Sequence, residues 1–521
     1  MSDIKILWAD DEIDRLKPHL KFLSKKGYEV ITVNNGHDAV EECQSRNDID
    51  IVFLDENMPG MTGLETLAKI KEENARLPIV MITKSEAEDV MEEAIGGQIT
   101  DYLIKPVHPN QILLTLKKIM ERSDLVREKT TSDYQQEFRQ ISMDINSGPD
   151  FEGWVEIYRR IINWELKLDA SDTTHMADII SMQKAEANAG FSKFIERNYI
   201  DWLYDDDDAP APVLSDTLLL EKVFKKMDNE VPKVLLLLDN LRYDQWKIIE
   251  PELTKLFRVE EEDYFYSILP TSTQYSRNAI FAGMMPAEIE QHYKQWWKND
   301  NEKGGKNLHE KDLLEEQLKR VFRIPPRMDY VKVTNVNNAG KLQDNILNYL
   351  NNELTVIVYN FIDMLSHART EMEVLKELAG DEKAYRSLTL SWFKNSPLYG
   401  ALEKLAERDV QLFVTTDHGT IRVNTPSRVV GDRETTPNLR YKVGRNLQYE
   451  KRDVLEVRNP GDAMLPRPNV SSTFIFAKDD KFFLYPNNYN HYHNYYRNTF
   501  QHGGISLEEI VCPVVRLRSR S

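Results

Sequence analysis

Asp417 and His418 stand side by side directly after the apolar run "QLFVTT" (411–416). Two other apolar runs in the same part of the chain end in acids, "KVLLLL" before Asp239 and "TVIVYNFI" before Asp363. Short apolar runs that end in a turn indicate buried strands. Parallel strands end at one edge of a sheet, and ligands bind at that edge. The three acids are therefore expected to lie close together.

Histidines complete this group. His367 lies four residues after Asp363, which puts both on one face if a helical turn follows the strand. His502 lies in "FQHGG", where glycines let the backbone approach closely. Imidazole with carboxylate suits Zn²⁺, with Mn²⁺ as a competitor. The predicted ligands, enough for two ions, are Asp239, Asp363, His367, Asp417, His418 and His502.

Hydroxyl side chains that could attack a phosphate occur in "LPTSTQYS" (269–276). Thr271 and Thr273 both precede a predicted helix, whose N-terminus would stabilise an anion through free N–H groups and its dipole. Two metal ions beside such a hydroxyl suit phosphoryl transfer. Residue type and position leave the choice between the two threonines open.

A second acidic group lies near the N-terminus. Asp10 and Asp11 close one predicted strand, and Asp55 closes another. Three converging carboxylates make an oxygen site suited to Mg²⁺. Thr83 and Lys105 end two further strands and would add a hydroxyl and an ammonium to a site for a phosphoryl group. Pro106 fits a cis turn after the lysine.

The elements that must position these residues fall into three regions. Residues 1–122 contain five short apolar runs separated by helix-length segments, which predicts a parallel sheet covered on both faces. Residues 123–205 have apolar residues at helical spacing and predict a small helical bundle that ends in an exposed acidic linker. Residues 206–521 again alternate strands with helices. Within them we expect a cap or insertion over 294–318 and a long loop over 485–504.

Composition limits the partners. The net charge of -18 over 521 residues argues against broad electrostatic capture of nucleic acid or anionic membrane. The two cysteines, Cys43 and Cys512, do not suggest a disulfide framework, and the chain shows neither a signal peptide nor an apolar run long enough to span a bilayer. We expect a cytoplasmic protein without membrane insertion. The strand "VLLLLD" imitates that of an ATPase, but no GxxxxGK[ST] loop accompanies it.

Residues 1–122 resemble the receiver domain of two-component response regulators, because suitable side chains stand at successive strand ends. The resemblance implies phosphorylation of Asp55 by a sensor histidine kinase, and Mg²⁺ bound by Asp10, Asp11, Asp55 and the backbone carbonyl of Asn57. It also implies that Thr83 and Lys105 contact the acyl phosphate and that Tyr102 is a switch aromatic. The alternative for Tyr102 is a half-buried strand tyrosine.

Residues from about 230 to 515 resemble the alkaline phosphatase superfamily, most closely its PglZ-type branch, in the order of Asp239, the Pro-Thr-rich segment, Asp363 with His367, Asp417 with His418, and His502. The resemblance implies one Zn²⁺ on Asp363, His367 and His502, and another on Asp239, Asp417, His418 and the nucleophile. Counting back from Gly283, with "SR" in register, gives Thr273 as that nucleophile and Thr271 as the alternative.

The whole chain is similar to a family of response regulators associated with bacterial type IX secretion. The fold class implied is multidomain α/β: a flavodoxin-like receiver, a helical bundle and an alkaline phosphatase-like domain. One hypothesis is a phosphorylation-controlled, metal-dependent phosphodiesterase acting on nucleotides or oligonucleotides, whose bases the aromatic residues of 485–500 could stack if they do not merely pack. The other is a signalling adaptor with structural metals. It would dimerise on phosphorylation and bind a transcription or sigma factor or a secretion component.

Overall fold

The computed structural model describes residues 4–46, 48–84, 99–170, 177–204, 210–228, 230–371, 380–432 and 435–520, and for 120–132 and 367–371 it describes the backbone only. The chain forms two compact units, residues 1–132 and 133–521, and each is described by itself. Residues 205–209 of the predicted acidic linker lie outside the described residues.

The first unit is a parallel five-stranded sheet in the order β2-β1-β3-β4-β5. Its strands and helices are β1 (Ile4–Ala9), α1 (Lys17–Lys25), β2 (Tyr28–Val33), α2 (Gly36–Ser45), β3 (Ile51–Asp55), α3 (Gly63–Glu73), β4 (Ile79–Thr83), β5 (Asp101–Ile104) and the start of α5 (Pro109–Asn146). The five predicted strands are confirmed. Pro106 follows a cis peptide bond, as predicted.

Alternation along the strands explains why both faces of this sheet are covered. Leu7 and Leu54 pack with α2 and α3 on one face, while Trp8 and Phe53 pack with α1 and α5 on the other. Successive side chains of a strand point to opposite faces, so a strand buried on both sides reads as a continuous apolar run. The flavodoxin-like fold predicted for the receiver is confirmed.

The second unit is built around a six-stranded sheet in the order β7-β19-β10-β6-β9-β8, in which β10, β6, β9 and β8 are parallel and β19 and β7 antiparallel. The strands are β6 (Lys233–Leu238), β7 (Phe257–Tyr266), β8 (Met328–Val333), β9 (Leu354–Tyr359), β10 (Gln411–Thr415) and β19 (Val511–Ser519). The helices are α6 (Phe151–Ala170), α7 (Ala177–Asn198), α8 (Tyr243–Leu256), α9 (Thr273–Ala282), α10 (Pro286–His292), α11 (Glu310–Val321), α12 (Val336–Tyr349), α13 (Phe361–Glu371), α15 (Glu382–Asn395), α16 (Pro397–Ala406), α17 (Tyr489–Tyr496) and α18 (Leu507–Ile510).

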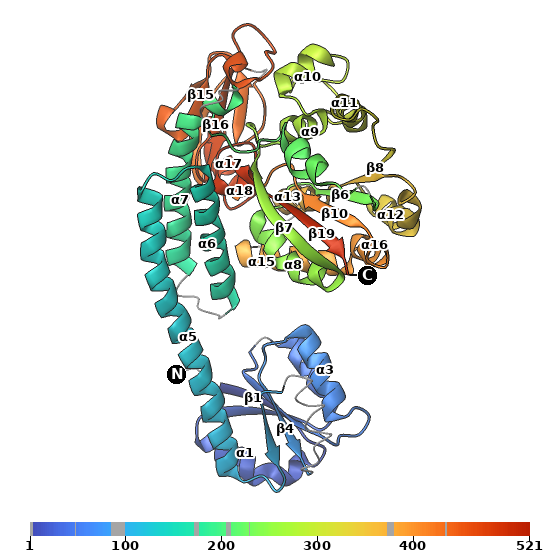
Figure 1. Ribbon diagram of the computed structural model, residues 1–521. Helices are drawn as coiled ribbons and strands as arrows, with labels where there is room; N and C mark the ends of the chain where they lie inside the picture. Colours follow the sequence, from blue (N-terminus) through green and yellow to red (C-terminus); the bar gives the residue numbers. More distant parts are fainter. Residues whose placement is uncertain are drawn as a thin grey trace. The chain divides into compact units, whose positions relative to one another are not determined.

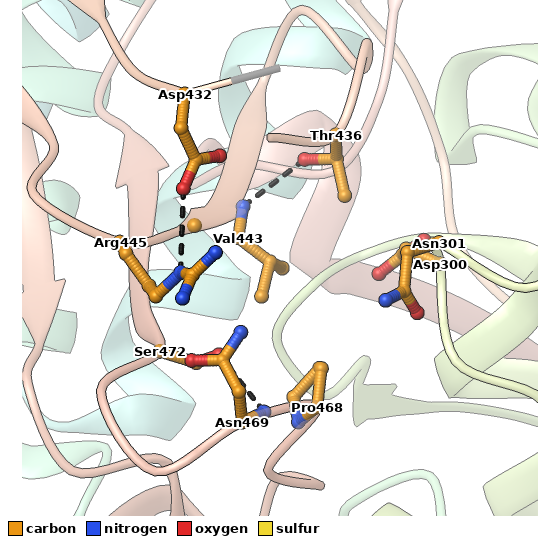
Figure 2. Close-up of a pocket in the computed structure, with 10 residues that line it drawn as sticks. Asp300, Asn301, Asp432, Thr436, Val443, Arg445, Pro468, Asn469 and Ser472 are labelled. Carbon is orange, nitrogen blue, oxygen red and sulfur yellow. Dashed lines mark hydrogen bonds and ion pairs between the residues drawn. The ribbon is translucent and has the colours of Figure 1, made fainter. Parts of the chain in front are cut away.

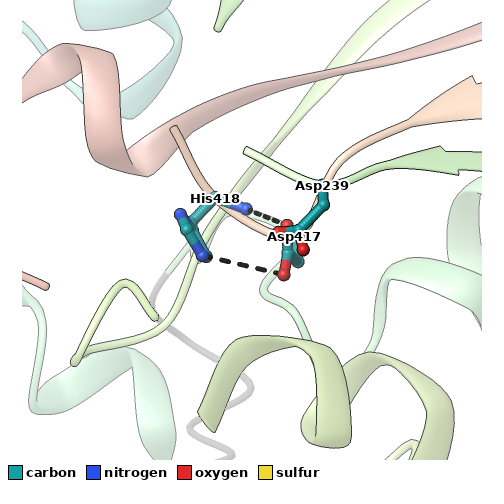
Figure 3. A group of neighbouring side chains, drawn as sticks. All are labelled: Asp239, Asp417 and His418. Carbon is teal, nitrogen blue, oxygen red and sulfur yellow. Dashed lines mark hydrogen bonds and ion pairs between the residues drawn. The ribbon is translucent and has the colours of Figure 1, made fainter. Parts of the chain in front are cut away.

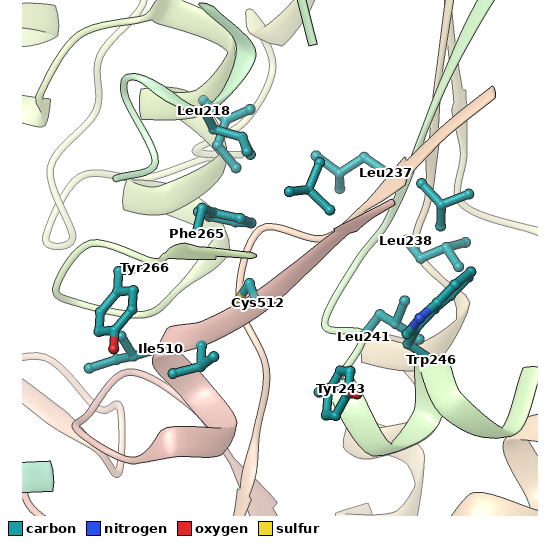
Figure 4. Close-up of a cluster of buried hydrophobic side chains, with 14 of the residues drawn as sticks. Leu218, Leu237, Leu238, Leu241, Tyr243, Trp246, Phe265, Tyr266, Ile510 and Cys512 are labelled. Atoms are coloured by element: carbon teal, nitrogen blue, oxygen red, sulfur yellow. The ribbon is translucent and has the colours of Figure 1, made fainter. Parts of the chain in front are cut away.

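The core of this unit runs through the central strand β6, all of whose residues are buried. Leu237 and Leu238 of β6, Trp246 of α8 and Cys512 of β19 belong to one cluster of buried residues (Figure 4). Tyr158 of α6 belongs to the same cluster, so the bundle helices share the core of the sheet. In Figure 1, α6 and α7 run side by side within this unit.

Smaller sheets follow the large one in the chain. They are the pair β11 (Ile421–Arg422) with β18 (Phe500–Gln501), the group β12 (Thr425–Val430), β14 (Gln448–Tyr449) and β17 (Lys481–Leu484), and the group β13 (Tyr441–Gly444), β15 (Val454–Val457) and β16 (Thr473–Ala477). The prediction of a long loop over 485–504 is wrong, because that segment holds α17 and β18. The segment 294–318 is partly helical, since α11 begins at Glu310.

Candidate active site

The ends of β6 and β10 bring the first acid-imidazole group together. Asp239 follows β6, and Asp417 and His418 follow β10, which pairs parallel with β6. One donor atom from each of these three side chains lies within 4.8 Å of the others (Figure 3). All three are buried. The predicted convergence of these residues at one sheet edge is therefore seen in the structure.

A second group lies beside the first. Asp363, near the start of α13, has Oδ1 3.9 Å from Nε2 of His502, which follows β18. The rings of His502 and His418 are stacked with centroids 4.3 Å apart, so the two groups adjoin. His367 lies one helical turn after Asp363 on α13, but its side chain is outside the described residues.

Asn240 joins the two groups, and sequence reasoning missed it. Its backbone N–H donates to Asp417 Oδ1 at 3.2 Å, and its side-chain nitrogen donates to Asp363 Oδ1 at 3.5 Å. It has a φ of 68°, a left-handed conformation that asparagine tolerates better than most residues. An Asn directly after a strand-end Asp was the available signal.

The two candidate threonines occupy different environments. Thr273 is the first residue of α9, and its hydroxyl lies 3.2 Å from His418 Nε2 and 3.5 Å from Asp239 Oδ1. The Thr271 hydroxyl instead donates to the carbonyl of Gly504 and accepts from the N–H of Gly503, each at 3.0 Å. The hydroxyl of Thr273 thus faces the acid-imidazole group, whereas that of Thr271 holds the backbone next to His502.

Arg277 is the second residue that sequence reasoning did not place in the site. It lies one turn after Thr273 on α9 and is fully buried. Its guanidinium contacts Asp239 and lies 3.0 Å from Asp417 Oδ2. The spacing of four residues from Thr273 was the signal that could have found it.

Burial and these charges set the acidities of the two carboxyl groups. Burial raises the pKa of Asp239 well above its usual range, and the nearby charges of Asp417 and Asp363 act in the same direction. Burial would also raise the pKa of Asp417, but Arg277 and His418 outweigh it and lower this pKa to about 2. Asp417 is thus held as a carboxylate, and a carboxylate together with imidazole side chains suits a divalent ion, so the residues present fit zinc or manganese.

The receiver group is also assembled. Carboxylate oxygens of Asp10, Asp11 and Asp55 lie within 4.8 Å of one another, as a Mg²⁺ site requires. Lys105 Nζ lies 3.1 Å from Asp10 Oδ2 and 2.8 Å from Asp55 Oδ1. Burial raises the pKa of Asp55, although Lys105 opposes the shift. The predicted site for a phosphoryl group therefore has its acids and its ammonium in place.

Three further receiver residues are located as follows. Thr83 ends β4, is buried and donates its hydroxyl hydrogen to Glu56. Asn57 is an exposed residue two positions after Asp55. Tyr102 is 41% exposed, a value that does not decide between a switch aromatic and a half-buried strand tyrosine. Their roles as contact, ligand and switch stay predictions.

A separate small cavity is lined by Asp300, Thr436, Val443, Arg445 and Asn469, among others (Figure 2). Its volume is about 20 Å³, which is room for about one water molecule. It is too small for a nucleotide, so it is no candidate for the substrate site.

Family models match three consecutive parts of the chain. A response regulator receiver domain matches residues 6–117, a PorX response regulator linker domain residues 124–203, and a BREX system PglZ alkaline phosphatase-like domain residues 218–517. The last match covers more than half of the chain. The chain belongs to the PglZ alkaline phosphatase-like family. Its receiver, linker and PglZ domains together form the architecture of a PorX-type response regulator.

Curated relatives match the receiver part. The transcriptional regulatory protein ZraR of Klebsiella oxytoca is 32% identical over 130 residues, which are 25% of this chain and 29% of ZraR. The alkaline phosphatase synthesis transcriptional regulatory protein PhoP of Bacillus subtilis (strain 168) is 29% identical over 124 residues, 23% of this chain and 50% of PhoP. The chain thus spans half or less of the length of these relatives.

Among solved structures, the chemotaxis protein CheY4 of Vibrio cholerae is 30% identical, with a TM-score of 0.22, and the match covers 22% of this chain and 98% of CheY4.

A receiver domain implies phosphorylation by a sensor histidine kinase, and receiver domains use Mg²⁺. Alkaline phosphatase-like domains are metalloenzymes of the phosphoesterase type. Within the described ranges, no helix has the length and apolar character needed to cross a bilayer.

Proposed function

We propose that this protein is a metal-dependent phosphodiesterase whose activity is controlled by phosphorylation of its receiver at Asp55. Nucleotides or oligonucleotides are its substrates. The protein acts in the cytoplasm, and its activity regulates type IX secretion. The observation that carries the enzymatic part is the Thr273 hydroxyl, which lies at a helix N-terminus within 3.2 Å of His418 Nε2 and 3.5 Å of Asp239 Oδ1. A hydroxyl next to side chains that can hold a metal ion is one usual arrangement for covalent catalysis, because the ion activates the nucleophile.

The side chains of the site have two roles: some would hold the metal ions, and one would react with the substrate. Asp239, Asp417 and His418 would hold one zinc ion, and Asp363, His367 and His502 the other, with Mn²⁺ as the alternative metal. Bound there, the ions would polarise the phosphoryl oxygens and favour the deprotonated hydroxyl.

The reacting hydroxyl is that of Thr273, which faces Asp239 Oδ1 and His418 Nε2. Because these two side chains would hold the zinc ion, the hydroxyl proton would pass to water. The first turn of α9, which begins at Thr273, would stabilise the charge of a phosphate bound there. The chain itself therefore supplies the attacking oxygen and the helix end that would bind the anion.

The receiver supplies the control. Asp55 would take the phosphoryl group with Mg²⁺ held by Asp10, Asp11, Asp55 and the carbonyl of Asn57, while Lys105 and Thr83 contact the phosphate. A new charge at Asp55 would change the surface that includes Tyr102 and favour a homodimer.

The test compares the zinc-loaded wild type with Thr273→Val and Thr271→Val on bis-p-nitrophenyl phosphate. We expect Thr273→Val to lose at least about 100-fold in rate with its metal content unchanged, because the attacking oxygen is gone. Thr271→Val should keep most of the rate, since its hydroxyl only holds backbone. Equal rates for the wild type and Thr273→Val, with metal bound, would contradict the assignment.

A second candidate is a signalling adaptor in which the metals are only structural. The observation in its favour is Arg277, whose positive charge already neutralises Asp239 and Asp417. Such an adaptor would bind a transcription factor, a sigma factor or a secretion component. It predicts that zinc-loaded wild type hydrolyses no phosphodiester and that Thr273→Val leaves signalling unchanged.

A further inference from the structure

The helix α17 has two different faces, although its sequence, "YNHYHNYY", is rich in aromatic rings along its whole length. Tyr489 and Tyr496 pack against the apolar cluster that contains Ile421 and Phe482. The rings that follow the other face, His491 and Tyr492, are exposed, Tyr492 to 41%. The structure therefore separates tyrosines that pack from rings that do not.

The rings along α17 form an ordered array. The rings of Tyr492 and Tyr496 are near parallel, at 15° with centroids 6.1 Å apart, and those of His491 and Tyr495 lie at 21° and 6.3 Å. Anchoring of Tyr496 in the cluster holds its neighbour Tyr492 in place. Two exposed asparagines, Asn490 and Asn494, lie among the rings. Rigid aromatic faces with amides beside them are suited to bind flat, hydrogen-bonding heterocycles.

The array is tethered directly to the proposed active site. The strand β18, only three residues after α17, pairs with β11 through Ile421–Gln501 and Arg422–Phe500. The strand β11 begins three residues after His418, and β18 ends one residue before His502. Six residues lie between Tyr495 and His502, a span of at most about 25 Å. The strand β18 thus links α17 to His502, and its partner β11 begins close to His418.

A positive charge near α17 would suit a nucleic acid strand. Arg497 is exposed at the C-terminal end of α17. An arginine beside stacked rings is the combination found where proteins hold single strands without reading their sequence.

We propose that the face of α17 formed by the exposed His491 and Tyr492 and the half-buried Tyr495 is a stacking platform for the bases of a single-stranded oligonucleotide whose phosphodiester enters the Thr273 site. This inference rests on the proposed function, because it assigns a binding surface to the same substrate. It makes the protein prefer base-bearing phosphodiesters to small synthetic esters.

The test uses a fluorescein-labelled single-stranded 12-mer and an abasic strand of the same length, with binding measured in zinc-loaded full-length protein carrying Thr273→Val so that neither strand is cut. We expect Tyr492→Ala to weaken binding of the base-bearing strand about tenfold, the size of one lost stack, and to leave the abasic strand unchanged. Tyr492→Phe should bind like the parent, because it keeps the ring. Val470→Ala, at a residue 98% exposed elsewhere, is the matched surface control.

Three results would overturn the inference: unchanged binding in Tyr492→Ala, equal loss for both strands, or loss in Tyr492→Phe. Hydrolysis of bis-p-nitrophenyl phosphate by the wild type tests the proposed function separately from this inference. Absence of hydrolysis in the wild type would contradict the proposed function, while the strand-binding comparison would still decide the platform.

Discussion

Arg277 stands where a metal ion would also be attracted. Its guanidinium contacts two buried carboxylates, Asp239 and Asp417. Removing one partner of a buried ion pair leaves an uncompensated charge and typically costs about 3–5 kcal/mol. Arg277 and zinc would therefore compensate the same negative charges. The loss of the arginine should lower the stability of the protein most when zinc is absent.

We expect Arg277→Gln to lower the free energy of unfolding by about 3 kcal/mol in metal-free protein, and zinc to restore a large part of the loss. Urea unfolding of the wild type and the variant, each with EDTA and with zinc, measures both effects. Arg258→Gln is the control, because that arginine is 70% exposed. Equal stability of Arg277→Gln and the wild type in EDTA would show that Arg277 does not compensate these acids.

Lys442 gives a prediction about pH. It is 1% exposed, donates to the carbonyl of Thr436 at 2.8 Å and lies 4.8 Å from the centre of the Tyr485 ring. Burial lowers its pKa from 10.5 to about 7. Between these values the unfolded chain binds more protons, so this group makes stability rise with pH. Below pH 7 its full cost is present, and near pH 10.5 the cost vanishes.

The substitution Lys442→Met keeps the buried stem and removes the amine. We expect it to raise the free energy of unfolding at pH 6 by a few kcal/mol, since each pKa unit is worth about 1.4 kcal/mol, and to raise it little near pH 10. Unfolding midpoints of the two proteins at pH 6, 8 and 10 give the difference directly. A constant difference across this range would mean that the amine stays charged in the fold.

At the scale of elements, the local sequence pattern was enough to predict the strands but not enough to predict the helix α17. Strands such as β6 are continuous apolar runs, and such runs have few other structures open to them. The helix α17 is made of asparagine, histidine and tyrosine, which have low helix propensity. It forms because Tyr489 and Tyr496 pack on residues from distant parts of the chain, among them Ile421 and Phe482, and no local signal encodes that packing.

The same contrast holds inside the site. Asp239, Asp417 and His418 could be predicted because they end strands, and parallel strands end together. Asn240 and Arg277 had only weak local signals, because their importance comes from contacts between residues far apart in the chain. For Asn240 these are Asp363 and Asp417, and for Arg277 they are Asp239 and Asp417.

At the scale of the whole molecule, ion pairs join the bundle helices to the sheet. Arg386 of α15 lies 3.0 Å from Glu165 of α6 and 3.0 Å from Asp244 of α8. Lys184 of α7 lies 3.0 Å from Glu165 and 3.8 Å from Glu508 of α18. Together with the shared apolar core, these pairs indicate that residues 133–521 unfold as one cooperative unit.

The receiver has its own two apolar clusters and should unfold separately. We therefore expect two unfolding transitions in calorimetry, and the ligand of each unit should raise the temperature of that unit's transition only. A ligand at 100 times its Kd stabilises the unit that binds it by about 2.7 kcal/mol, enough to move that transition by a few degrees. Zinc should raise only the transition of residues 133–521, and Mg²⁺ with beryllofluoride, a phosphoryl analogue, only that of the receiver. Asp55→Asn should abolish the second shift and keep the first, whereas Asp417→Ala should do the reverse. One transition that moves with either ligand would show instead that the two units unfold together, and the phosphorylation signal would then reach the Thr273 site through a shared folding equilibrium.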